Sequence, residues 1–513
     1  MSRTSARWLV VVAAAVLAGC ASLAPRPSLP EDPALPAGEG TRLDAAIAPL
    51  EAQHPGQSAF RLVSEGPEAF ALRSRTAAGA GRSLDVQTYI WHNDLTGAVL
   101  GWQLIEAADR GVKVRVLVDD FDARSKNYEF AGLDAHPNIE VRLFNPFASR
   151  RGAARFAAEV IGDFDRLNRR MHNKSWIADN RIAIVGGRNL GNEYFGASED
   201  VNFVDLDFAM IGPVVREASA AFDRYWNSEL AYPIVLLAPD DVTPAALEAL
   251  RQRALEALPG VEQTKFAREL RENDAVQRLL AGDWPLHWAS SYRFVADDPE
   301  KALGRGTGPA GSQVLEHLAP AFRDASTRVT VISPYFVPGK DGTENLVAAA
   351  RAGKQVRILT NSLAANDVAA VYGGYAKWRK LLLEGGVELW EIKPSPGSDV
   401  ERSLFGSSGA SLHTKSLAVD ERTVFVGSFN LDPRSASLNT EQGVFVESPV
   451  LAAQIEALFA YDSSGARAWA VTLEDGRLRW TDDAGTYTST PQASAWRKFQ
   501  AWLAGILPIE SQL

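Results

Sequence analysis

The chain contains a short segment whose residue types and spacing suit phosphate chemistry. His172 and Lys174 are two residues apart, so on a strand both side chains point to the same face. Asp179 then opens a turn, an apolar run returns as a second strand, and Asn189 follows shortly after a pair of glycines. Such a hairpin gathers an imidazole, an ammonium and a carboxamide around one point, as the binding of an anionic phosphate requires.

The same pattern occurs a second time. His413, Lys415, Asp420 and Asn430 each lie 241 residues after their counterparts, as the difference 413 − 172 illustrates. The equal spacing indicates a duplicated unit. Two intact copies predict one catalytic site to which both copies contribute.

Two imidazoles and two lysines are sufficient for exchange at a phosphodiester. One neutral imidazole can attack phosphorus and form a phosphohistidine, and we favour His172 for that role. The other imidazole, once protonated, can donate to the leaving oxygen and then accept the proton of the incoming hydroxyl. Lys174 and Lys415 would supply fixed positive charge where negative charge develops. Asn189 and Asn430 would add neutral hydrogen-bond donors there.

Each histidine also needs a carboxylate on Nδ1 to fix its tautomer. Asp205 and Glu441 are the candidates, because they lie downstream of the two motifs in segments that align at an offset of 236 residues. Asp207 is an alternative to Asp205. Asp179 and Asp420 are expected to tie down the hairpin turns rather than to transfer protons.

The composition fits a globular catalytic protein and argues against nucleic acid as its partner. The chain has 513 residues, 46% of them hydrophobic and 23% charged, which suits two or three domains with large cores. Its formal net charge is −10, whereas general nucleic-acid binders carry a basic excess. Neither a metal nor another cofactor is expected, because the motif chemistry needs none and the single cysteine cannot form a zinc cluster with these histidines.

The segments around each motif alternate between strand-like and helix-like patterns. In the first half, strands are expected at 83–91, 113–120 and 139–147 and a helix at 97–111. In the second half, strands are expected at 328–337, 355–362 and 387–394 and a helix at 343–354. These units predict an α/β fold with two similar lobes of mixed, largely parallel β-sheet, flanked by helices and related by pseudo-two-fold symmetry.

This pattern divides the chain into five regions. They are a signal peptide (1–19), a Pro-rich tether (20–42), a first lobe (43–231), a helical insertion or linker (232–305) and a second lobe (306–513). The second lobe is expected to end in a hairpin and an amphipathic helix at 496–508. Docking of that helix on the body and placement at a membrane interface both fit the pattern. An aromatic- and arginine-rich stretch at 144–171 fits either anionic lipid headgroups or a solvated helix over the sheet edge.

The N-terminus resembles a bacterial lipoprotein signal. Two arginines and an apolar run too short to span a bilayer precede Cys20, the only cysteine of the chain. This pattern predicts acylation of Cys20 and a lipid anchor in the periplasm of the bacterial cell envelope. The residue after it, Ala21, resembles the sorting pattern for the outer membrane. An ordinary secretory signal with an incidental cysteine is the alternative.

The two motifs, HxKxxxxD followed by GxxN, resemble those of the phospholipase D superfamily. The stretches TYIWHNDLTG, VGGRNLGNEYFGA and GSFNLDPRSASLNTE are similar to the bacterial cardiolipin synthases, in particular their C-type branch, over roughly residues 50–513. The resemblance implies phosphatidyl transfer between lipid headgroups to form cardiolipin, with phosphatidylglycerol and phosphatidylethanolamine as substrates. One position departs from the pattern, because Gly187 stands where the second motif has Ser428.

Three other functions remain compatible with the sequence. A phospholipase D would use water as the acceptor, since hydrolysis and synthesis differ only in which hydroxyl reaches the phosphohistidine. A phosphodiesterase acting on nucleic acid is disfavoured by the acidic balance. A non-catalytic envelope lipoprotein would use the fold as a scaffold. The sequence predicts no particular partner protein.

Overall fold

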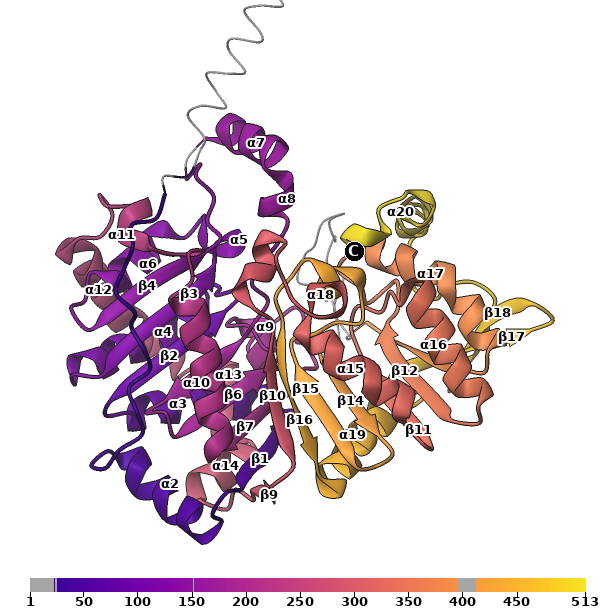
Figure 1. Cartoon of the computed structure of the whole chain (residues 1–513), viewed down its shortest axis with the longest axis horizontal. Helices are drawn as coiled ribbons and strands as arrows, with labels where there is room; N and C mark the ends of the chain where they lie inside the picture. The colour runs from indigo at the N-terminus through magenta and orange to yellow at the C-terminus, as the bar shows by residue number, and fades with distance from the viewer. Residues whose placement is uncertain (1–22, 24, 151, 395–411) are drawn as a thin grey trace, which may run out of the picture.

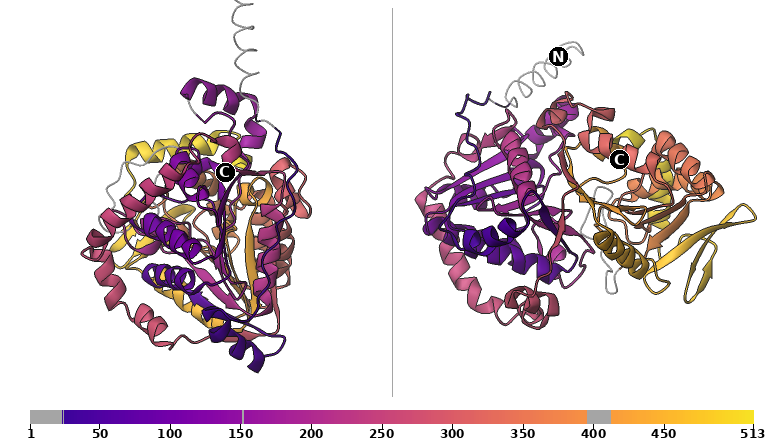
Figure 2. Two further views of the ribbon diagram at one scale, coloured as in Figure 1. Left: turned by 90° about the vertical axis from the view of Figure 1, so that its left-hand side faces the viewer. Right: turned by 60° about the horizontal axis from the view of Figure 1, so that its bottom comes forward.

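The chain forms two lobes of similar construction, each built on one β-sheet with helices against it. The computed structural model describes residues 23, 25–150, 152–394 and 412–513. Within these ranges the first sheet has nine strands and the second has ten. The two lobes lie side by side, with the earlier residues in indigo to magenta and the later ones in orange to yellow (Figure 1; Figure 2). The signal peptide 1–19 and Cys20 lie outside the described residues.

The first lobe precedes the connecting segment. Its elements are α2 (Arg42–Gln53), β1 (Ser58–Val63), α3 (Gly66–Gly79), β2 (Ser83–Thr88), α4 (Leu95–Asp109), β3 (Lys113–Asp119), α5 (Asp120–Ala123), α6 (Asn127–Asp134), β4 (Ile139–Phe144), α7 (Ala153–Gly162), α8 (Phe164–Leu167), β5 (Ser175–Ala178), β6 (Ile182–Gly186), α9 (Asn192–Phe195), β7 (Asp207–Ile211), α10 (Pro213–Trp226) and β8 (Ala231–Pro233).

The connecting segment and the second lobe follow. The connection contains α11 (Ile234–Leu237), α12 (Pro244–Val261), α13 (Lys265–Glu272), α14 (Asp274–Ala281), β9 (His287–Ala289), β10 (Tyr292–Ala296), η1 (Pro299–Leu303) and η2 (Pro309–Gly311). The second lobe contains α15 (Gln313–Asp324), β11 (Arg328–Ile332), α16 (Gly339–Arg351), β12 (Gln355–Asn361), α17 (Ala369–Glu384), β13 (Glu388–Ile392), β14 (Ser416–Val419), β15 (Thr423–Gly427), α18 (Pro433–Ser437), β16 (Gln442–Glu447), α19 (Pro449–Asp462), β17 (Ala468–Glu474), β18 (Arg477–Asp482), β19 (Gly485–Tyr487), α20 (Ala495–Ile506) and η3 (Glu510–Gln512).

The central strands follow the same order in both sheets. That order is β4-β3-β2-β5-β6-β7 in the first and β13-β12-β11-β14-β15-β16 in the second, as the predicted duplication requires. The sheets are mixed, as predicted, but the expectation of largely parallel pairing is wrong. In the described sheets, parallel pairing is confined to β2-β3-β4 and β11-β12-β13. Each motif lies on a hairpin, and a two-residue turn can join only antiparallel strands.

The two motif hairpins, β5-β6 and β14-β15, close through equivalent tight turns. Asp179 and Asp420 have φ of 51° and 52°, and the residue after each also has positive φ, as in type I′ hairpin turns. The Asp179 carboxylate accepts backbone N–H bonds of 2.7 to 3.2 Å from residues 81–83 at the start of β2. The Asp420 carboxylate accepts equivalent bonds of 2.7 to 3.0 Å from residues 326–328. Both aspartates therefore tie a turn to the neighbouring strand and lie away from the catalytic chemistry.

The segment 232–305 is not purely helical, contrary to the expectation of a helical insertion. Helices α11 to α14 account for its first part. Strand β9 then pairs antiparallel with β1 in the first sheet, and β10 pairs antiparallel with β16 in the second. Such short strands lack the alternating pattern that would reveal them in the sequence. The segment thus adds a strand to each lobe instead of only linking the two.

The Pro-rich stretch is extended over residues 25–40, as a tether would be, but it is bound to the first lobe. The backbone N–H groups of Asp32 and Ala34 donate to side chains of Asn227 and Asp223, at 2.9 and 2.8 Å. The Asp32 carboxylate also contacts Lys113. The part of the stretch from Asp32 onward is therefore held against the lobe surface.

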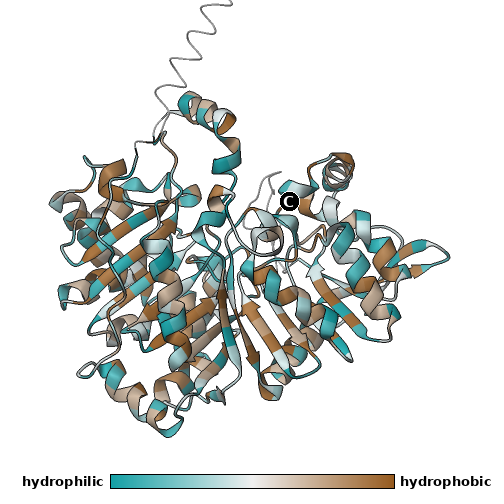
Figure 3. Ribbon diagram, in the orientation of Figure 1, coloured by the Kyte–Doolittle hydropathy of each residue, from teal (hydrophilic) through white to brown (hydrophobic). Residues whose placement is uncertain are grey.

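One apolar core crosses from the first lobe to the second. It contains residues of β6, β7 and α10 from one side and of β15, β16 and α19 from the other, including Val185, Phe208, Val426 and Val444. Figure 3 shows the strands of both sheets as largely hydrophobic. Close packing of this kind gives two lobes one fixed arrangement, which a site shared between them needs.

The C-terminal elements lie at the outer edge of the second lobe. Strands β17 and β18 form the predicted hairpin, whose turn residues Asp475 and Gly476 have φ of 49° and 71°. Helix α20 follows and packs against α17. Across the described ranges, none of the helices is both long and apolar enough to cross a membrane.

Candidate active site

The two motifs meet at the lobe boundary through matched backbone hydrogen bonds. The N–H of His172 donates to the carbonyl of Thr440 at 2.9 Å, and the N–H of His413 donates to the carbonyl of Val204 at 2.7 Å. Thr440 and Val204 immediately precede the candidate carboxylates Glu441 and Asp205. Each motif is thus joined to the carboxylate-bearing segment of the other lobe.

Buried polar side chains at the ends of two equivalent strands hold the residue before each histidine. Asp119, at the end of β3, accepts the N–H of Met171 at 2.7 Å. Asn361, at the end of β12, forms two hydrogen bonds with the backbone of Leu412, at 3.0 and 3.2 Å. These contacts fix the histidine backbones independently of their side chains.

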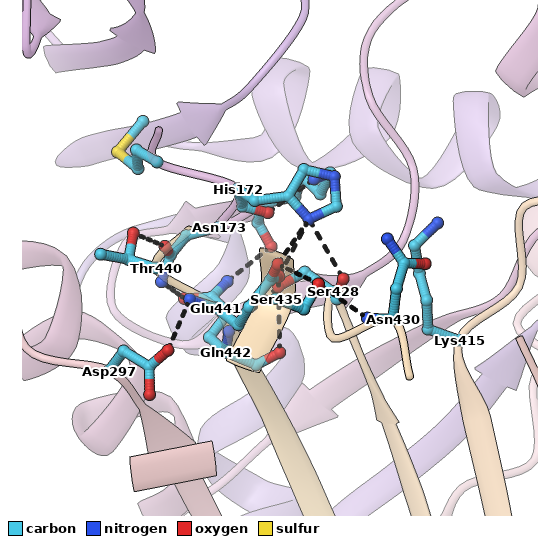
Figure 4. Close-up of polar contacts among 12 residues, drawn as sticks. His172, Asn173, Asp297, Lys415, Ser428, Asn430, Ser435, Thr440, Glu441 and Gln442 are labelled. Carbon is cyan, nitrogen blue, oxygen red and sulfur yellow. Dashed lines mark hydrogen bonds and ion pairs between the residues drawn. The ribbon is translucent and has the colours of Figure 1, made fainter. Parts of the chain in front are cut away.

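The carboxylates pair with the histidines across the lobe boundary. His172 Nδ1 lies 2.9 Å from Glu441 Oε2, and His413 Nδ1 lies 2.6 Å from Asp205 Oδ2. The carbonyl of Ser428, which can only accept, lies 3.1 Å from His172 Nδ1, so this nitrogen carries the proton. Figure 4 shows His172 above Glu441 and Ser428. Each imidazole therefore keeps its Nε2 lone pair for attack on phosphorus or for accepting a proton.

Asp207, the alternative partner of His413, is engaged elsewhere. Its carboxylate contacts the guanidinium groups of Arg73 and Arg188, at 3.0 and 3.2 Å. All three side chains are buried. Asp205 is thus the acidic residue beside His413. Asp207 instead forms a buried ion-pair cluster with Arg73 and Arg188.

Both motif lysines are buried at the same boundary. Lys174 Nζ donates to the carbonyl of His172 at 2.5 Å, and Lys415 Nζ donates to the carbonyl of His413 at 2.6 Å. Burial lowers the pKa of Lys174 well below its ordinary value and lowers the pKa of Lys415 to about 8. Two poorly solvated ammonium groups side by side favour an anion between them.

Burial also keeps both imidazoles neutral, but their carboxylates are unequal. Burial, followed by the charge of the adjacent lysine, lowers the pKa of His172 well below its ordinary value and the pKa of His413 to about 4. Burial raises the pKa of Glu441 to about 7. Burial acts in the same direction on Asp205, yet its interaction with His413, followed by the charges of Lys415 and Arg188, holds its pKa below the ordinary value. The ionised Asp205 makes His413 the imidazole that more readily accepts a proton.

The two asparagines of the motifs have different surroundings. The Asn189 side chain donates to the Tyr194 hydroxyl at 2.9 Å and accepts the N–H of Ile90 at 3.2 Å. Asn430 lies beside Lys415 in Figure 4, and within the described part of the chain its buried carboxamide oxygen has no hydrogen-bond partner. The Asn189 carboxamide is therefore held in place by Tyr194 and Ile90, whereas the Asn430 oxygen has no such partner.

Aromatic rings enclose both imidazoles. The ring of Tyr89 meets His172 edge-on at 5.2 Å, and Lys174 Nζ lies 5.5 Å from the same ring. Tyr194 meets His413 edge-on at 5.3 Å, while Phe203 stacks on it at 5.5 Å. The sequence indicates Tyr89, which follows a strand of the duplicated pattern. It does not indicate Tyr194 or Phe203, because their contact with His413 spans the lobe boundary.

A buried aspartate of the connecting segment supports the site from behind. Asp297 accepts the N–H of Glu441 at 3.1 Å, and its own N–H donates to the Glu441 carbonyl at 2.8 Å. Its carboxylate also binds Lys301 and the Ser312 hydroxyl, at 2.7 and 2.9 Å. The sequence does not reveal this role, because Asp297 and Asp298 before Pro299 resemble an ordinary helix start.

His92 directly follows the strand expected at 83–91, which should end near the site, and the structure places it beside the site and not within it. Its Nδ1 is 3.0 Å from Glu193, and this contact raises the pKa of His92. With Asp94 these side chains form a group of possible metal ligands. The Asp94 carboxylate, however, already accepts the N–H groups of Gly97 and Asn192 at 3.0 and 2.7 Å, as a helix cap.

The difference between Gly187 and Ser428 has a steric cause. A Cβ at position 187 would lie 2.2 Å from Asp205 Oδ1, so no side chain fits there. At the equivalent place, the Ser428 hydroxyl donates to Glu441, and so does the Ser435 hydroxyl, at 2.8 Å. The absence of any side chain at position 187 thus leaves room for Asp205 to reach His413.

Gly187→Ser is expected to lower kcat by about 100-fold, because it displaces the carboxylate that orients His413. Gly187→Ala should be equally damaging, since the Cβ alone makes the contact. Steady-state kinetics together with circular dichroism and melting curves would check this. Ser428→Gly opens space without a collision and serves as the matched variant, with a smaller expected loss. Higher activity of Gly187→Ser than of Gly187→Ala would contradict the steric explanation.

Comparison with known proteins agrees with this geometry. The family profile described as "Cardiolipin synthase, PLD-like domain" matches residues 75–226 and 318–463, once in each lobe. Cardiolipin synthase C of Escherichia coli (strain K12) is 42% identical over 479 residues, which cover 91% of this chain and 99% of that protein. Cardiolipin synthase B of the same strain is 25% identical over 387 residues, covering 75% of this chain and 76% of that protein.

A solved structure has the same fold. Phosphatidylserine synthase of Haemophilus influenzae Rd KW20 aligns with a TM-score of 0.55 at 15% identity, covering 80% of this chain and 87% of that chain. The profile match in both lobes and the extended identity to cardiolipin synthase C settle the assignment. The chain belongs to the family of cardiolipin synthases with PLD-like domains.

Proposed function

We propose that the protein transfers a phosphatidyl group from one phospholipid to the headgroup alcohol of another and so forms cardiolipin. The observation that carries this proposal is the crossed pairing of His172 with Glu441 and of His413 with Asp205, beside two buried lysines. Phosphatidylglycerol is the proposed acceptor. Phosphatidylglycerol or phosphatidylethanolamine is the proposed donor.

In the first step, His172 acts as the nucleophile. Its Nε2 lone pair forms a bond to phosphorus while the bond from phosphorus to the leaving alcohol oxygen breaks. His413, which takes up a proton on Nε2 when the anionic phosphodiester binds beside it, donates that proton to the oxygen. The assignment follows from the two carboxylates, because the ionised Asp205 favours a proton on His413, whereas His172 stays unprotonated.

In the second step, the acceptor lipid replaces the leaving alcohol. His413 Nε2, now neutral, takes the proton of the acceptor hydroxyl, whose oxygen attacks phosphorus as the bond to His172 breaks. Lys174 and Lys415 stabilise the charge on the phosphoryl oxygens in both steps, and Asn430 adds a neutral donor. Water at the same position would give phosphatidic acid, so exclusion of water decides between synthesis and hydrolysis.

The test is the product formed by purified protein on vesicles. With phosphatidylglycerol labelled in its headgroup glycerol, mass spectrometry should find labelled cardiolipin and one free glycerol per cardiolipin. With phosphatidylethanolamine added, the release of ethanolamine would identify the donor. Phosphatidic acid as the sole product would replace the proposal with a phospholipase D. Nicking of supercoiled plasmid without any lipid product would favour a nuclease, and the absence of both products would favour a scaffold.

We also propose that Cys20 carries a lipid anchor and that the protein faces the periplasm from the outer membrane. The apolar run and small residues before Cys20 support this proposal. Metabolic labelling with an alkyne fatty acid should mark the protein, and Cys20→Ser should remove the label. Fractionation should place the wild-type chain with outer-membrane markers. A labelled Cys20→Ser chain, or a wild-type chain in the soluble fraction, would refute the anchor.

A further inference from the structure

Helix α20 has an amphipathic arrangement opposite to that of an ordinary surface helix. Its buried side is made of Arg497, Gln500 and the small residues Ala501 and Ala504. Its exposed side carries the large apolar residues. These, with the residue after the helix, are Trp496, Phe499, Trp502, Leu503, Ile506 and Leu507, and we call them the α20 face.

The orientation of α20 is fixed by its buried side. A Cβ on Gly373 of α17 would lie 2.3 Å from the Ala501 carbonyl oxygen, so the two helices approach as closely as a glycine allows. The Arg497 guanidinium donates to the carbonyl oxygens of Leu363 and Asn366 beneath the helix. Rotation of α20 to bury its aromatic side would break these contacts. The exposure of the aromatic side is therefore a consequence of the packing.

The α20 face is large for a side open to water. Trp496, Trp502 and Ile506 are 62%, 60% and 61% exposed, and the rings of Trp496, Phe499 and Trp502 follow one another at 5.5 and 5.9 Å. Exposed apolar surface costs about 25 cal/mol per Å² relative to its burial. Contiguous patches of this kind mark interaction sites.

A second group of exposed apolar residues lies across the site from α20. Ile161 of α7 is 83% exposed, Phe164 of α8 is 49% exposed, and Phe121 of α5 is 59% exposed. Helices α7 and α20 lie at the same end of the molecule in Figure 1 and in the left view of Figure 2. The helices that carry Ile161 and the α20 face therefore lie at the same end of the molecule.

The segments that follow α8 and α20 both contact α18, next to the second motif. The Asn168 side chain, just after α8, donates to Gln512 at 2.6 Å. Arg434 of α18 donates to the Asn168 carbonyl at 2.6 Å, and its own N–H donates to the carbonyl of Leu513 at 2.8 Å. The charge of Arg434 also contributes to the lowered pKa of His172. The segments adjoining the two apolar groups thus meet at α18, close to His172.

A chain of rings links Phe121 to the reacting histidine. Phe121 stacks on Tyr89 at 5.9 Å, and Tyr89 meets His172 at 5.2 Å. A lipid whose phosphate is at His172 would therefore have apolar side chains on both sides of its exit. Tryptophan is the residue most typical of the interface between headgroups and acyl chains.

We propose that the α20 face, together with Phe121, Ile161 and Phe164, inserts into the interfacial layer of a phospholipid bilayer and seats the mouth of the active site on it. This proposal rests on the proposed function, which makes phospholipid the substrate. It differs from N-terminal anchoring, since it assigns the orientation of the catalytic body to side chains of α20, α5 and α7–α8. Arg155 and Lys498, which lie on α7 and α20, would remain at headgroup level.

An environment-sensitive dye on a single thiol tests the contact. In the full chain with Cys20→Ser, which removes the only native cysteine, Ile506→Cys is labelled with a nitrobenzoxadiazole dye and mixed with vesicles of phosphatidylglycerol and phosphatidylethanolamine. Its emission should shift to the blue and be quenched by lipids carrying nitroxide on the acyl chain. Val450→Cys at the start of α19 is the matched control. The Ser448 N–H donates to the carbonyl of Arg422, beside the hairpin turn at the end of the second lobe away from His413, so the exposed side chain at 450 should give neither effect. The dye senses only its surroundings, so N-terminal attachment cannot produce the signal.

The outcomes separate this proposal from the proposed function. Trp496→Ser with Trp502→Ser should lower the initial rate on long-chain vesicles about tenfold and leave the rate on monomeric dihexanoyl phosphatidylglycerol within about twofold of wild type. Val450→Ser, at the other end of the second lobe, should change neither rate. An unshifted dye at position 506 would overturn the proposal, as would an equal loss of rate on monomeric lipid. A blue shift before vesicles are added, with a dimer in size-exclusion chromatography, would assign the face to a second copy. If the wild-type protein made no cardiolipin, the proposed function would be refuted. The dye result would still test membrane insertion, because it does not depend on the product.

Discussion

His172→Ala and His413→Ala are each expected to lower turnover on phospholipid vesicles by about 10⁴-fold or more, because each removes a group that bonds to phosphorus or moves a proton in both steps. Their lobes contribute one imidazole each, and the two share one site at the boundary. Neither lobe should therefore retain activity alone. Cardiolipin formation measured by mass spectrometry at saturating lipid would give the two rates.

The two variants should differ when the leaving group needs no proton. With a phosphatidyl ester of p-nitrophenol, His413→Ala should still release a burst of p-nitrophenolate equal to the enzyme concentration, since His172 can attack and then waits for an activated acceptor. His172→Ala should give no burst. Acid-labile label on the protein in the first case would confirm the phosphohistidine.

A histidine outside the site serves as the control for these variants. His317 donates from its ring to the carbonyl of Gln313 within its own helix, so His317→Ala should change turnover by less than about twofold. A burst in His172→Ala and none in His413→Ala would reverse the assignment of nucleophile and acid. A burst in both variants would contradict a single nucleophile.

Local sequence pattern was sufficient to predict the duplicated architecture but not the strand directions. The equal offset of 241 residues between the motifs, and the turn aspartates Asp179 and Asp420, identify two equivalent hairpins, which the structure places at equivalent positions in the two sheets. Strand direction in the rest of each sheet depends on which segments pair, and that is decided by contacts distant in sequence. The three-residue strand β9 and the five-residue strand β10 illustrate the limit, because their pairing partners lie in different lobes.

The site residues could likewise be predicted from local sequence, whereas their contacts across the lobe boundary could not. The motif residues and the carboxylates Asp205 and Glu441 follow from spacing and chemistry. The pairing of each carboxylate with the histidine of the other lobe could not be predicted. No local pattern indicates that Glu441 contacts His172 and that Asp205 contacts His413. The support by Asp297 is hidden for the same reason.

Lys415→Met is expected to lower kcat/KM by about 10²- to 10³-fold, since it removes a buried positive charge from the phosphoryl oxygens. In the wild-type protein, burial lowers the pKa of Lys415 to about 8. The ammonium is therefore lost as the pH rises through that value, and activity should fall on the alkaline side of about pH 8, an effect that Lys415→Met should lack. Steady-state rates between pH 6 and 10 would test both expectations.

The same substitution is expected to stabilise the fold. The folded-state pKa of about 8 is below the ordinary lysine pKa of 10.5, so below pH 8 the folded protein holds a charged group that the unfolded chain accommodates better. The difference of about 2.5 units corresponds to a cost of about 3 kcal/mol, which is fully present below pH 8 and disappears as the pH rises through 10.5. Lys415→Met removes that cost and should melt at a higher temperature than wild type at pH 7, with a smaller gain at pH 9.5.

Lys340→Met separates this effect from a general loss of surface charge. Lys340 of α16 is exposed and lies 4.0 Å from Glu344, so its replacement should change neither the melting temperature nor the rate appreciably. A Lys415→Met variant that lost activity and also melted at a lower temperature would indicate that the ammonium holds the two lobes together. A variant that lost activity while gaining stability would show that the charge is retained for its action on phosphate, because a buried ammonium that weakens the fold persists only where an anion is to be bound.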